Sequence, residues 1–145
     1  MNLETIPAPC VCTTIRKAGR ALLRRYEAAV ASTGVTITQF ALLRALERNG
    51  PMPLSRLADE MVMERTSLYR TLEPLVATAA VAVEQAPVGR SKVASLTAEG
   101  SALIEQVLPH WAGAQRQVVD RIGADAWRAL AASLLEIPEL LETKP

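Results

Sequence analysis

The chain has 145 residues and a formal net charge of +1, and half of its residues are hydrophobic although only 3% are aromatic. This length suits a single domain, and the abundance of Ala and Leu predicts an aliphatic, mainly helical core. The near-neutral charge is far from the strongly basic balance of many nucleic-acid-binding domains. The chain has neither the roughly 18-residue apolar run of a membrane span nor a signal peptide, so we expect a cytoplasmic protein without a membrane partner.

The N-terminal region should contain a short flexible segment, residues 1–11, followed by a long helix. From about residue 12 to residue 33, apolar residues recur at helical spacing, and Gly34 provides a stop signal. Between Arg16 and Arg25 the sequence carries several bases and no acid. The helix is therefore predicted to have one apolar side and one basic side.

The second helix has an unusually complete start signal. Thr36 is followed three residues later by Gln39, which is the spacing of a capping box, and Val35 and Phe40 are placed to form the hydrophobic staple around it. The helix should run to about Arg48, before a segment that contains Asn, Gly and Pro.

Residues 54–97 predict a helix, a tight turn, a second helix and a β-hairpin. The first helix should span residues 54–61 and the second residues 64–77, with Leu68, Leu72, Leu75 and Val76 buried. Pro74 should bend the second helix, because proline removes a backbone hydrogen bond. Two β-rich runs, residues 81–85 and 93–96, follow on either side of a loop at residues 87–91.

The C-terminal part predicts two more helices. One should run from about residue 97 to residue 122 with a kink at Pro109, and the last from about residue 125 to residue 142 with a break at Pro138. The helix, turn, helix and hairpin of residues 54–97 form the pattern of a winged helix-turn-helix. The terminal helices carry more apolar surface than such a compact domain can cover. The excess predicts a partner, most simply a second copy of the chain.

Three segments carry a resemblance to a known family: LSRLADEM, ERTSLYRTLEPL and GRSKVASLTAEG. With them, the chain resembles the MarR family of bacterial transcriptional regulators along nearly its whole length. Two positions depart from the family pattern. Val88 stands two residues before Arg90, where the family usually has an Asp, so we expect a differently held wing, and Ala79 stands where Gly is common.

The resemblance implies a mainly α fold with a small β-hairpin wing. It assigns residues 35–100 to a winged helix-turn-helix DNA-binding lobe, and residues 12–34 and 101–145 to a helical dimerisation lobe. It further implies a homodimeric repressor that binds double-stranded DNA at a pseudo-palindromic operator. Many members of the family lose DNA affinity when they bind a small aromatic or phenolic effector.

The candidate DNA contacts lie at the start of the second helix of the helix-turn-helix and at the hairpin. The five in the helix are Arg65, Thr66, Ser67, Tyr69 and Arg70, and the two in the hairpin are Arg90 and Lys92. Arginine can bind guanine or phosphate, and local bases can hold DNA despite a neutral net charge, because phosphate attraction is short-ranged at physiological salt. The alternative is an ordinary solvated helix face and a solubilising loop.

The two cysteines, Cys10 and Cys12, suggest a second activity. An OhrR-like peroxide-sensing branch of the family carries a reactive Cys, held by tyrosines, at the start of its first helix. Cys12 matches that position and Tyr26 matches one tyrosine, but Arg16 and Ile37 replace the others. A cysteine at a helix start near bases has a lowered pKa and is easily oxidised. The alternative is a pair of inert residues in the N-terminal segment.

A possible effector pocket involves Arg16, Tyr26, His110 and Trp111, for which the alternative is simple packing. We expect neither a metal nor a cofactor, because one His and two Cys cannot complete a metal cluster. We also expect no enzyme activity, because the chain has no P-loop, GxGxxG or nucleophile elbow. A non-DNA-binding helical interaction protein of the same fold is the remaining alternative, supported by the neutral charge and the altered wing.

Overall fold

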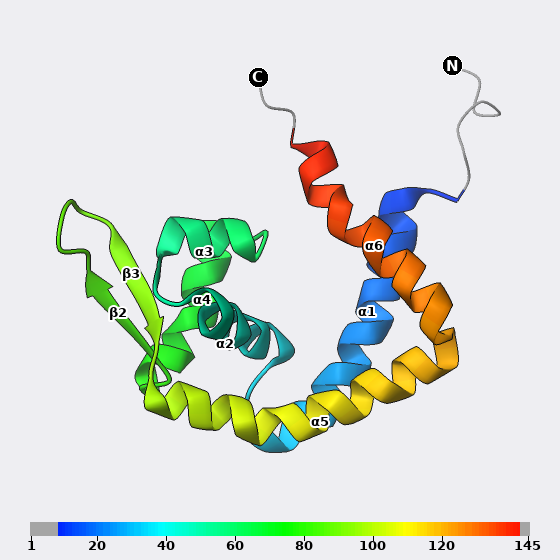
Figure 1. The fold of residues 1–145 in the computed structure, drawn as a ribbon, viewed down its shortest axis with the longest axis horizontal. Coiled ribbons are helices and arrows are strands. Elements are labelled where there is room, and N and C mark those ends of the chain that lie inside the picture. The colour runs from blue at the N-terminus through cyan, green and yellow to red at the C-terminus, as the bar shows by residue number, and fades with distance from the viewer. Residues whose placement is uncertain (1–8, 143–145) are drawn as a thin grey trace.

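The structure is a computed structural model that describes residues 9–142, and it has two lobes joined by long helices (Figure 1). The elements, in chain order, are α1 (Val11–Val30), the short 3-10 helix η2 (Ala31–Thr33), α2 (Ile37–Asn49), β1 (Met52–Pro53), α3 (Leu54–Glu60), α4 (Arg65–Ala77), β2 (Val81–Gln85), β3 (Lys92–Leu96), α5 (Ala98–Ile122) and α6 (Ala124–Leu141). The predicted fold class is confirmed, and the expected helices and hairpin lie within three residues of their predicted bounds.

The first lobe packs α2, α3 and α4 against a three-stranded antiparallel sheet. The strand order is β1–β3–β2, and Met52 of β1 pairs with Ala94 while Gln85 of β2 pairs with Lys92. The core of this lobe is aliphatic and includes Leu42, Leu43, Leu57 and Leu68, all at most 1% exposed. The sequence does not predict β1, because two residues are too few to show a strand period.

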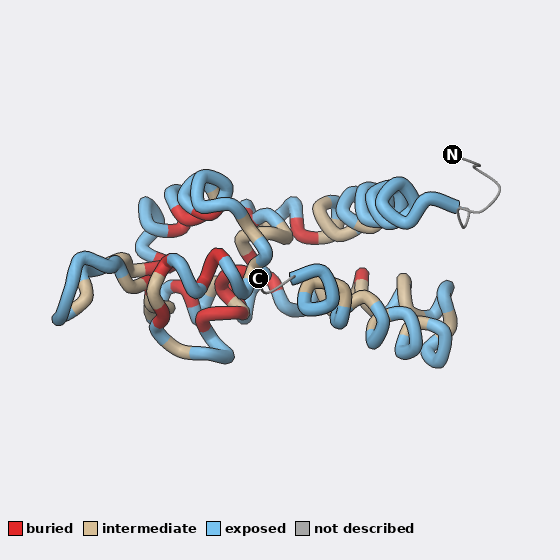
Figure 2. The backbone as a smooth tube through the Cα atoms, turned by 90° about the horizontal axis from the view of Figure 1, so that it is seen from above, coloured by how far each residue is buried: buried red, intermediate tan, exposed pale blue. Residues whose placement is uncertain are grey.

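The second lobe is formed by helices that bury little of their own surface. Only Val30 of α1 is buried, and no residue of α6 is buried. Figure 2 shows α1 and α6 as largely exposed, in separate layers. Large apolar side chains on these helices are open to solvent, including Val11, Leu135, Leu140 and Leu141, each at least 68% exposed. These helices therefore leave large apolar side chains exposed, in keeping with the excess of apolar surface in the sequence.

The start of α2 is fixed by two sets of hydrogen bonds. The Thr36 hydroxyl accepts from the Gln39 amide, and the Gln39 side chain accepts from the Thr36 amide, which confirms the capping box. In addition, the Glu27 carboxylate of α1 accepts the Ile37 amide at 3.1 Å. Because this bond crosses from α1 to α2, it ties the orientation of the long helix to the first lobe.

Among residues 9–142, two non-glycine residues have a left-handed backbone, and both lie where a helix ends. Val62 follows α3 with φ of 50°, and Ala79 follows α4 with φ of 59°. This conformation costs about 1–2 kcal/mol for residues with a Cβ, most of all for a β-branched one. The positive φ of Ala79 explains why glycine is common at this position in the family that the sequence resembles.

Some local predictions were wrong. The break expected at Pro138 does not occur, since α6 continues to Leu141; no residue of α6 is buried, so water can reach the backbone groups that the proline leaves without a partner. Val76 was predicted to be buried but is 42% exposed. It follows Leu75 directly, and because neighbouring residues of a helix point about 100° apart, Val76 is turned away from the core that Leu75 faces.

Among residues 9–142, no single helix is both long enough and apolar enough to cross a membrane. The helical segments Val11–Thr33 and Ile37–Asn49 satisfy the same length and composition test only as a pair, bent by 79°.

Candidate nucleic-acid interface

Helix α4 is anchored along one side and exposed along the other. Leu68, Leu72 and Leu75 are at most 3% exposed and recur at i, i+4 and i+7, so they hold one stripe of the helix against the core. Arg65, Tyr69 and Arg70 of the same helix lie outside this stripe and are exposed. The sequence therefore fixes which surface of α4 a ligand can reach.

The first turns of α4 and the hairpin enclose a shared hollow of about 200 Å³. Its walls include Arg65 and Tyr69 from the helix, and Arg90, Ser91 and Lys92 from the hairpin. Bases from two elements that are 20 or more positions apart in sequence thus converge on one small surface. Such a surface attracts a phosphate backbone.

A second hollow, of about 490 Å³, continues this surface along α4. It is lined by Thr66, Tyr69, Arg70 and Glu73 of the helix, and by Lys92 at the tip end of β3. Together the two hollows bring six of the seven predicted contact residues to one face. Ser67 faces a different hollow, together with Thr71 and with Glu27 of α1, and only Arg70 borders both of these α4 surfaces.

The bases on this face are available for an external anion. The ion pairs of residues 9–142 join Arg44 to Glu47, Arg48 to Glu60 and Arg128 to Asp125. None of these pairs involves a base of α4 or of the hairpin. Glu73 is the one acid in the lining of the two hollows, so the local charge is positive.

The hairpin tip is closed by backbone and amide hydrogen bonds. The Ala86 amide donates to the Ser91 carbonyl at 2.8 Å, and the Gln85 side-chain amide donates to the Gly89 carbonyl at 3.2 Å. Gly89 has φ of 88°, a conformation that glycine adopts without strain. Val88, which replaces the acid typical of the family, is 87% exposed. The Gln85 side-chain amide therefore helps to hold this tip closed.

The far end of α4 is fastened to the start of α5. The Thr97 hydroxyl donates to the Ala79 carbonyl at 2.6 Å and accepts the Gly100 amide at 3.0 Å. A Cβ on Gly100 would lie 2.5 Å from Leu96 Cδ1 and still closer to the Ala80 carbonyl oxygen. The absence of a side chain at position 100 therefore lets α5, α4 and the hairpin approach one another.

Sequence reasoning missed some lining residues of the α4–hairpin face. Ser55 of α3 and Ser91 of the tip border the first hollow, and Glu73 borders the second. The position of Ser91 between Arg90 and Lys92 was a usable signal. Ser55 had none, because its place beside the hairpin depends on how α3 packs.

The cysteines lie at the start of α1, and both are exposed. Hydrogen bonds from the Thr13 backbone amide and hydroxyl, and from the Cys12 amide, lower the pKa of the Cys10 thiol. Tyr26 lies 14 residues beyond Cys12 in the same helix, or roughly 21 Å at 1.5 Å per residue. Within one subunit, therefore, Tyr26 does not contact Cys12.

Two of the four predicted effector-site residues approach a common junction. The Tyr26 hydroxyl of α1 donates to the Gln115 side chain of α5, and Trp111, one turn earlier, packs against Phe40 of α2 with ring centroids 6.1 Å apart. Burial raises the pKa of Tyr26. His110 is exposed, and Arg16 lies ten residues before Tyr26, so neither joins this junction within one subunit.

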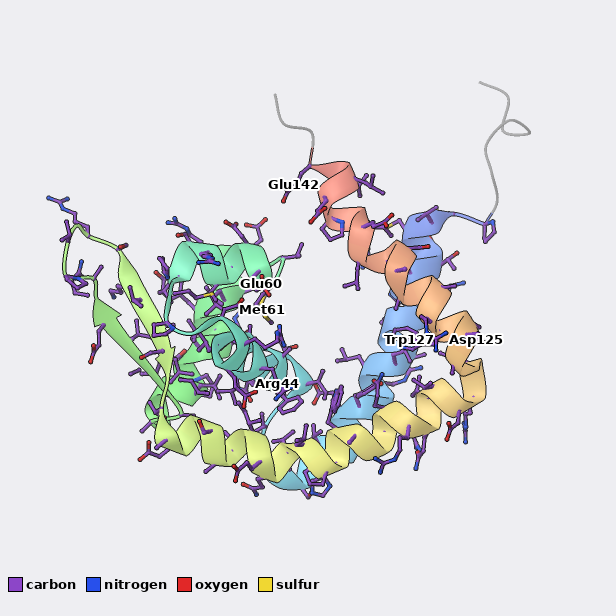
Figure 3. All side chains as sticks on the ribbon, in the orientation of Figure 1. Arg44, Glu60, Met61, Asp125, Trp127 and Glu142 are labelled. Carbon is purple, nitrogen blue, oxygen red and sulfur yellow. The ribbon has the colours of Figure 1, made fainter. Side chains whose placement is uncertain are left out.

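A larger cleft, of about 1110 Å³, lies between the α3–α4 turn and α6. Figure 3 shows side chains on its two sides, with Glu60 at the end of α3 and Glu142 at the end of α6. Leu135 and Val62, which line it, are 78% and 72% exposed. In the part of the chain described by the structure, no group of His, Cys, Asp and Glu has the arrangement of a metal site.

No protein-family model matches the sequence, and no curated protein matches it. Solved structures do. The transcriptional regulator MosR of M. tuberculosis, in complex with DNA, is 31% identical with a TM-score of 0.82, covering 92% of this chain and 97% of that one. A structure on the regulation of DNA binding of Bordetella bronchiseptica BpsR by 6-hydroxynicotinic acid is 20% identical (TM-score 0.80, coverage 91% and 97%). A MarR-family regulator from Silicibacter pomeroyi is 22% identical (TM-score 0.70, coverage 91% and 89%).

Proposed function

Because the chain belongs to the MarR family of transcriptional regulators, we propose that it is a homodimeric, sequence-specific DNA-binding repressor released from its operator by a small molecule. The observation that carries this proposal is the single basic face shared by α4 and the hairpin. In the proposed complex with DNA, α4 enters a major groove while Arg90 and Lys92 contact the flanking backbone or minor groove.

The dimer joins the terminal helices of two subunits. Residues 12–34 and 101–145 form the dimerisation lobe in this proposal, and residues 35–100 form the DNA-binding lobe. The exposed apolar side chains of α1 and α6 support it, since a second copy covers the surface that a single subunit leaves open. Two α4 helices then meet half-sites about one helical turn, roughly 34 Å, apart.

The effector is a small aromatic or phenolic compound that binds between the two lobes. Tyr26 and Trp111 supply aromatic surface at the junction of α1, α2 and α5, and the bond from Glu27 to the Ile37 amide links that junction to the DNA-binding lobe. BpsR, a structural neighbour, has its DNA binding regulated by the aromatic 6-hydroxynicotinic acid. A ligand that separates α1 from α2 changes the spacing of the two α4 helices.

A salt titration of DNA binding tests this function. Duplexes selected from a random pool by the wild-type protein should bind with an affinity that falls steeply with salt, because each phosphate contact releases counterions. A non-DNA-binding interaction protein of the same fold selects no duplex and shows no affinity to lose. If the protein selects no duplex even at low salt, the proposal is wrong.

The second candidate function, redox control of DNA binding, rests on the lowered pKa of Cys10. A lowered pKa keeps more of the thiol as the reactive thiolate near neutral pH. The Cys10 thiolate attacks a peroxide and becomes a sulfenate while the alcohol or water leaves. The Cys12 thiol then displaces the protonated sulfenic oxygen as water, and a disulfide forms. In this scheme Cys10 reacts first, whereas the sequence match had singled out Cys12.

We expect peroxide to release DNA from the wild type but not from Cys10→Ser. The matched Cys12→Ser variant should form the sulfenate and no disulfide, which mass spectrometry distinguishes. Because the chain has only these two cysteines, the double Ser variant controls for oxidation elsewhere. Equal release from the wild type and the double variant would exclude the cysteines as the sensor.

A further inference from the structure

Helix α1 presents a basic face that begins in its N-terminal half and extends to Arg24. Arg16, Arg20 and Arg24 recur every four residues, so their side chains follow one another along the helix, with Lys17 beside them. All four are exposed. In Figure 1 this half of α1 lies at the opposite end of the molecule from the β2–β3 hairpin. The basic face therefore lies away from the proposed DNA-binding surface.

Helix α6 presents an acidic face in its C-terminal half. Glu136, Glu139 and Glu142 recur every three residues and are exposed, and they share this half of the helix with the exposed Leu135 and Leu140. Figure 3 shows Glu142 at the end of the helix. Acids beside apolar side chains at 73–78% exposure form a surface suited to a partner that is both apolar and basic.

Neither face is neutralised within the described chain. The ion pairs of residues 9–142 lie in α2, between α2 and α3, and at the start of α6, and they involve no member of either face. Arg25, next to the basic face, donates to the neutral Gln117 side chain. Although α6 crosses α1 in the view of Figure 1, Figure 2 shows the two helices in separate layers.

We propose that the basic face of α1 (Arg16, Lys17, Arg20 and Arg24) pairs with the acidic face of α6 (Glu136, Glu139 and Glu142) of a second copy of the chain. This inference rests on the proposed homodimer and names the charges that orient it. In a twofold dimer the contact occurs twice, because each subunit supplies one face of each sign. The neighbouring apolar side chains, Ile15 and Leu23 on α1 and Leu135 and Leu140 on α6, contribute the buried area, and the charges set the register.

Charge reversal tests the pairing. Arg16→Glu with Arg20→Glu should raise the dimer dissociation constant roughly tenfold or more at low salt, since two attractions become repulsions in both copies of the contact. Glu136→Arg with Glu139→Arg should have the same effect. Added salt should reduce the difference from wild type. Sedimentation without DNA measures the dimer apart from any effect on operator binding.

Mixing the two variants distinguishes pairing between subunits from pairing within one. In the mixed dimer, both contacts again join opposite charges, so the heterodimer should form with wild-type affinity. Pairing within one chain would be broken in both variants, and mixing would restore nothing. Failure to form the heterodimer would therefore overturn the proposal, as would wild-type dimerisation by either variant alone.

A control and the wild type complete the experiment. Arg44→Glu with Arg48→Glu makes the same charge change on α2, outside both faces, and should leave the dimer dissociation constant unchanged. An equal loss there would mean that net charge, and not the pairing, governs dimerisation, which would contradict the proposal. A wild type that stays monomeric would instead refute the homodimer itself.

Discussion

Replacing Gly100 by Ala should lower the free energy of unfolding by about 3 kcal/mol, at the upper end of overpacking effects. The added Cβ meets Leu96 Cδ1 at 2.5 Å and lies closer still to the Ala80 carbonyl oxygen. A flexible side chain can turn away from such a contact, but the Ala80 carbonyl belongs to the segment that joins α4 to β2. The first turn of α5 must therefore move, which also strains the hydrogen bonds of Thr97.

Gly113→Ala is the matched control, because it makes the same change in the same helix. Its Cβ would meet nothing within 4 Å, and alanine is the better helix former by up to about 1 kcal/mol, so stability should hold or rise. Urea unfolding at one fixed protein concentration compares the variants on equal terms. If Gly100→Ala unfolds at the same urea concentration as wild type, α5 does not approach Ala80 as closely as described.

The second large effect is expected for Arg70→Ala, which should weaken operator binding by about 1–3 kcal/mol, or roughly 5- to 150-fold. Arg70 borders the second hollow of the α4–hairpin face and also the separate hollow that Ser67 faces, and it forms no ion pair within residues 9–142. Its side chain is exposed, so its removal should leave the unfolding transition unchanged. Fluorescence anisotropy on the selected duplex measures the loss.

A control variant and a comparison across DNA sequences show what the loss in Arg70→Ala means. Arg44→Ala removes a half-buried arginine of α2 that lies outside the α4–hairpin face, and it should not change DNA affinity. If Arg70 contacts phosphate, the loss should be equal on all sequences and the salt slope should fall by about one; if it reads a base, specificity at one position should relax. Wild-type affinity in Arg70→Ala would remove this residue from the interface.

The reliable sequence predictions are those that depend on nearby residues. Thr36 and Gln39 are three positions apart, and their side chains act on each other's backbone, so their capping box could be recognised before the fold was known. The spacing of Leu68, Leu72 and Leu75 likewise fixed the buried side of α4, and with it the exposed side that carries the candidate contacts.

Contacts between distant segments could not be predicted in the same way. The role of Gly100 depends on Ala80 and Leu96, and the cap on Ile37 comes from Glu27 in another helix. The choice between the two cysteines is a similar case. The family match favoured Cys12, but the hydrogen bonds at the start of α1 act on Cys10, whose pKa they lower. These features require the relative positions of atoms that sequence spacing does not give.

The proposed regulation by an effector depends on the junction of the two lobes. Helix α1 contacts α5 through Tyr26 and Arg25, and it contacts α2 through Glu27. A change at this junction therefore reaches the DNA-binding lobe through a hydrogen bond to the start of α2. In the proposed dimer, the paired terminal helices hold α1 in place. A shift at the junction then moves α2, and with it the α4–hairpin face, relative to those helices.

Hydroxyl-radical footprinting of the wild-type protein on a selected duplex tests the central claim most directly, because it reports how many DNA-binding faces touch the duplex and where. Two subunits that each place α4 in a major groove should protect two segments about one helical turn, or roughly 10 base pairs, apart on the same side of the duplex. A single protected segment, bound by one subunit, would contradict the account.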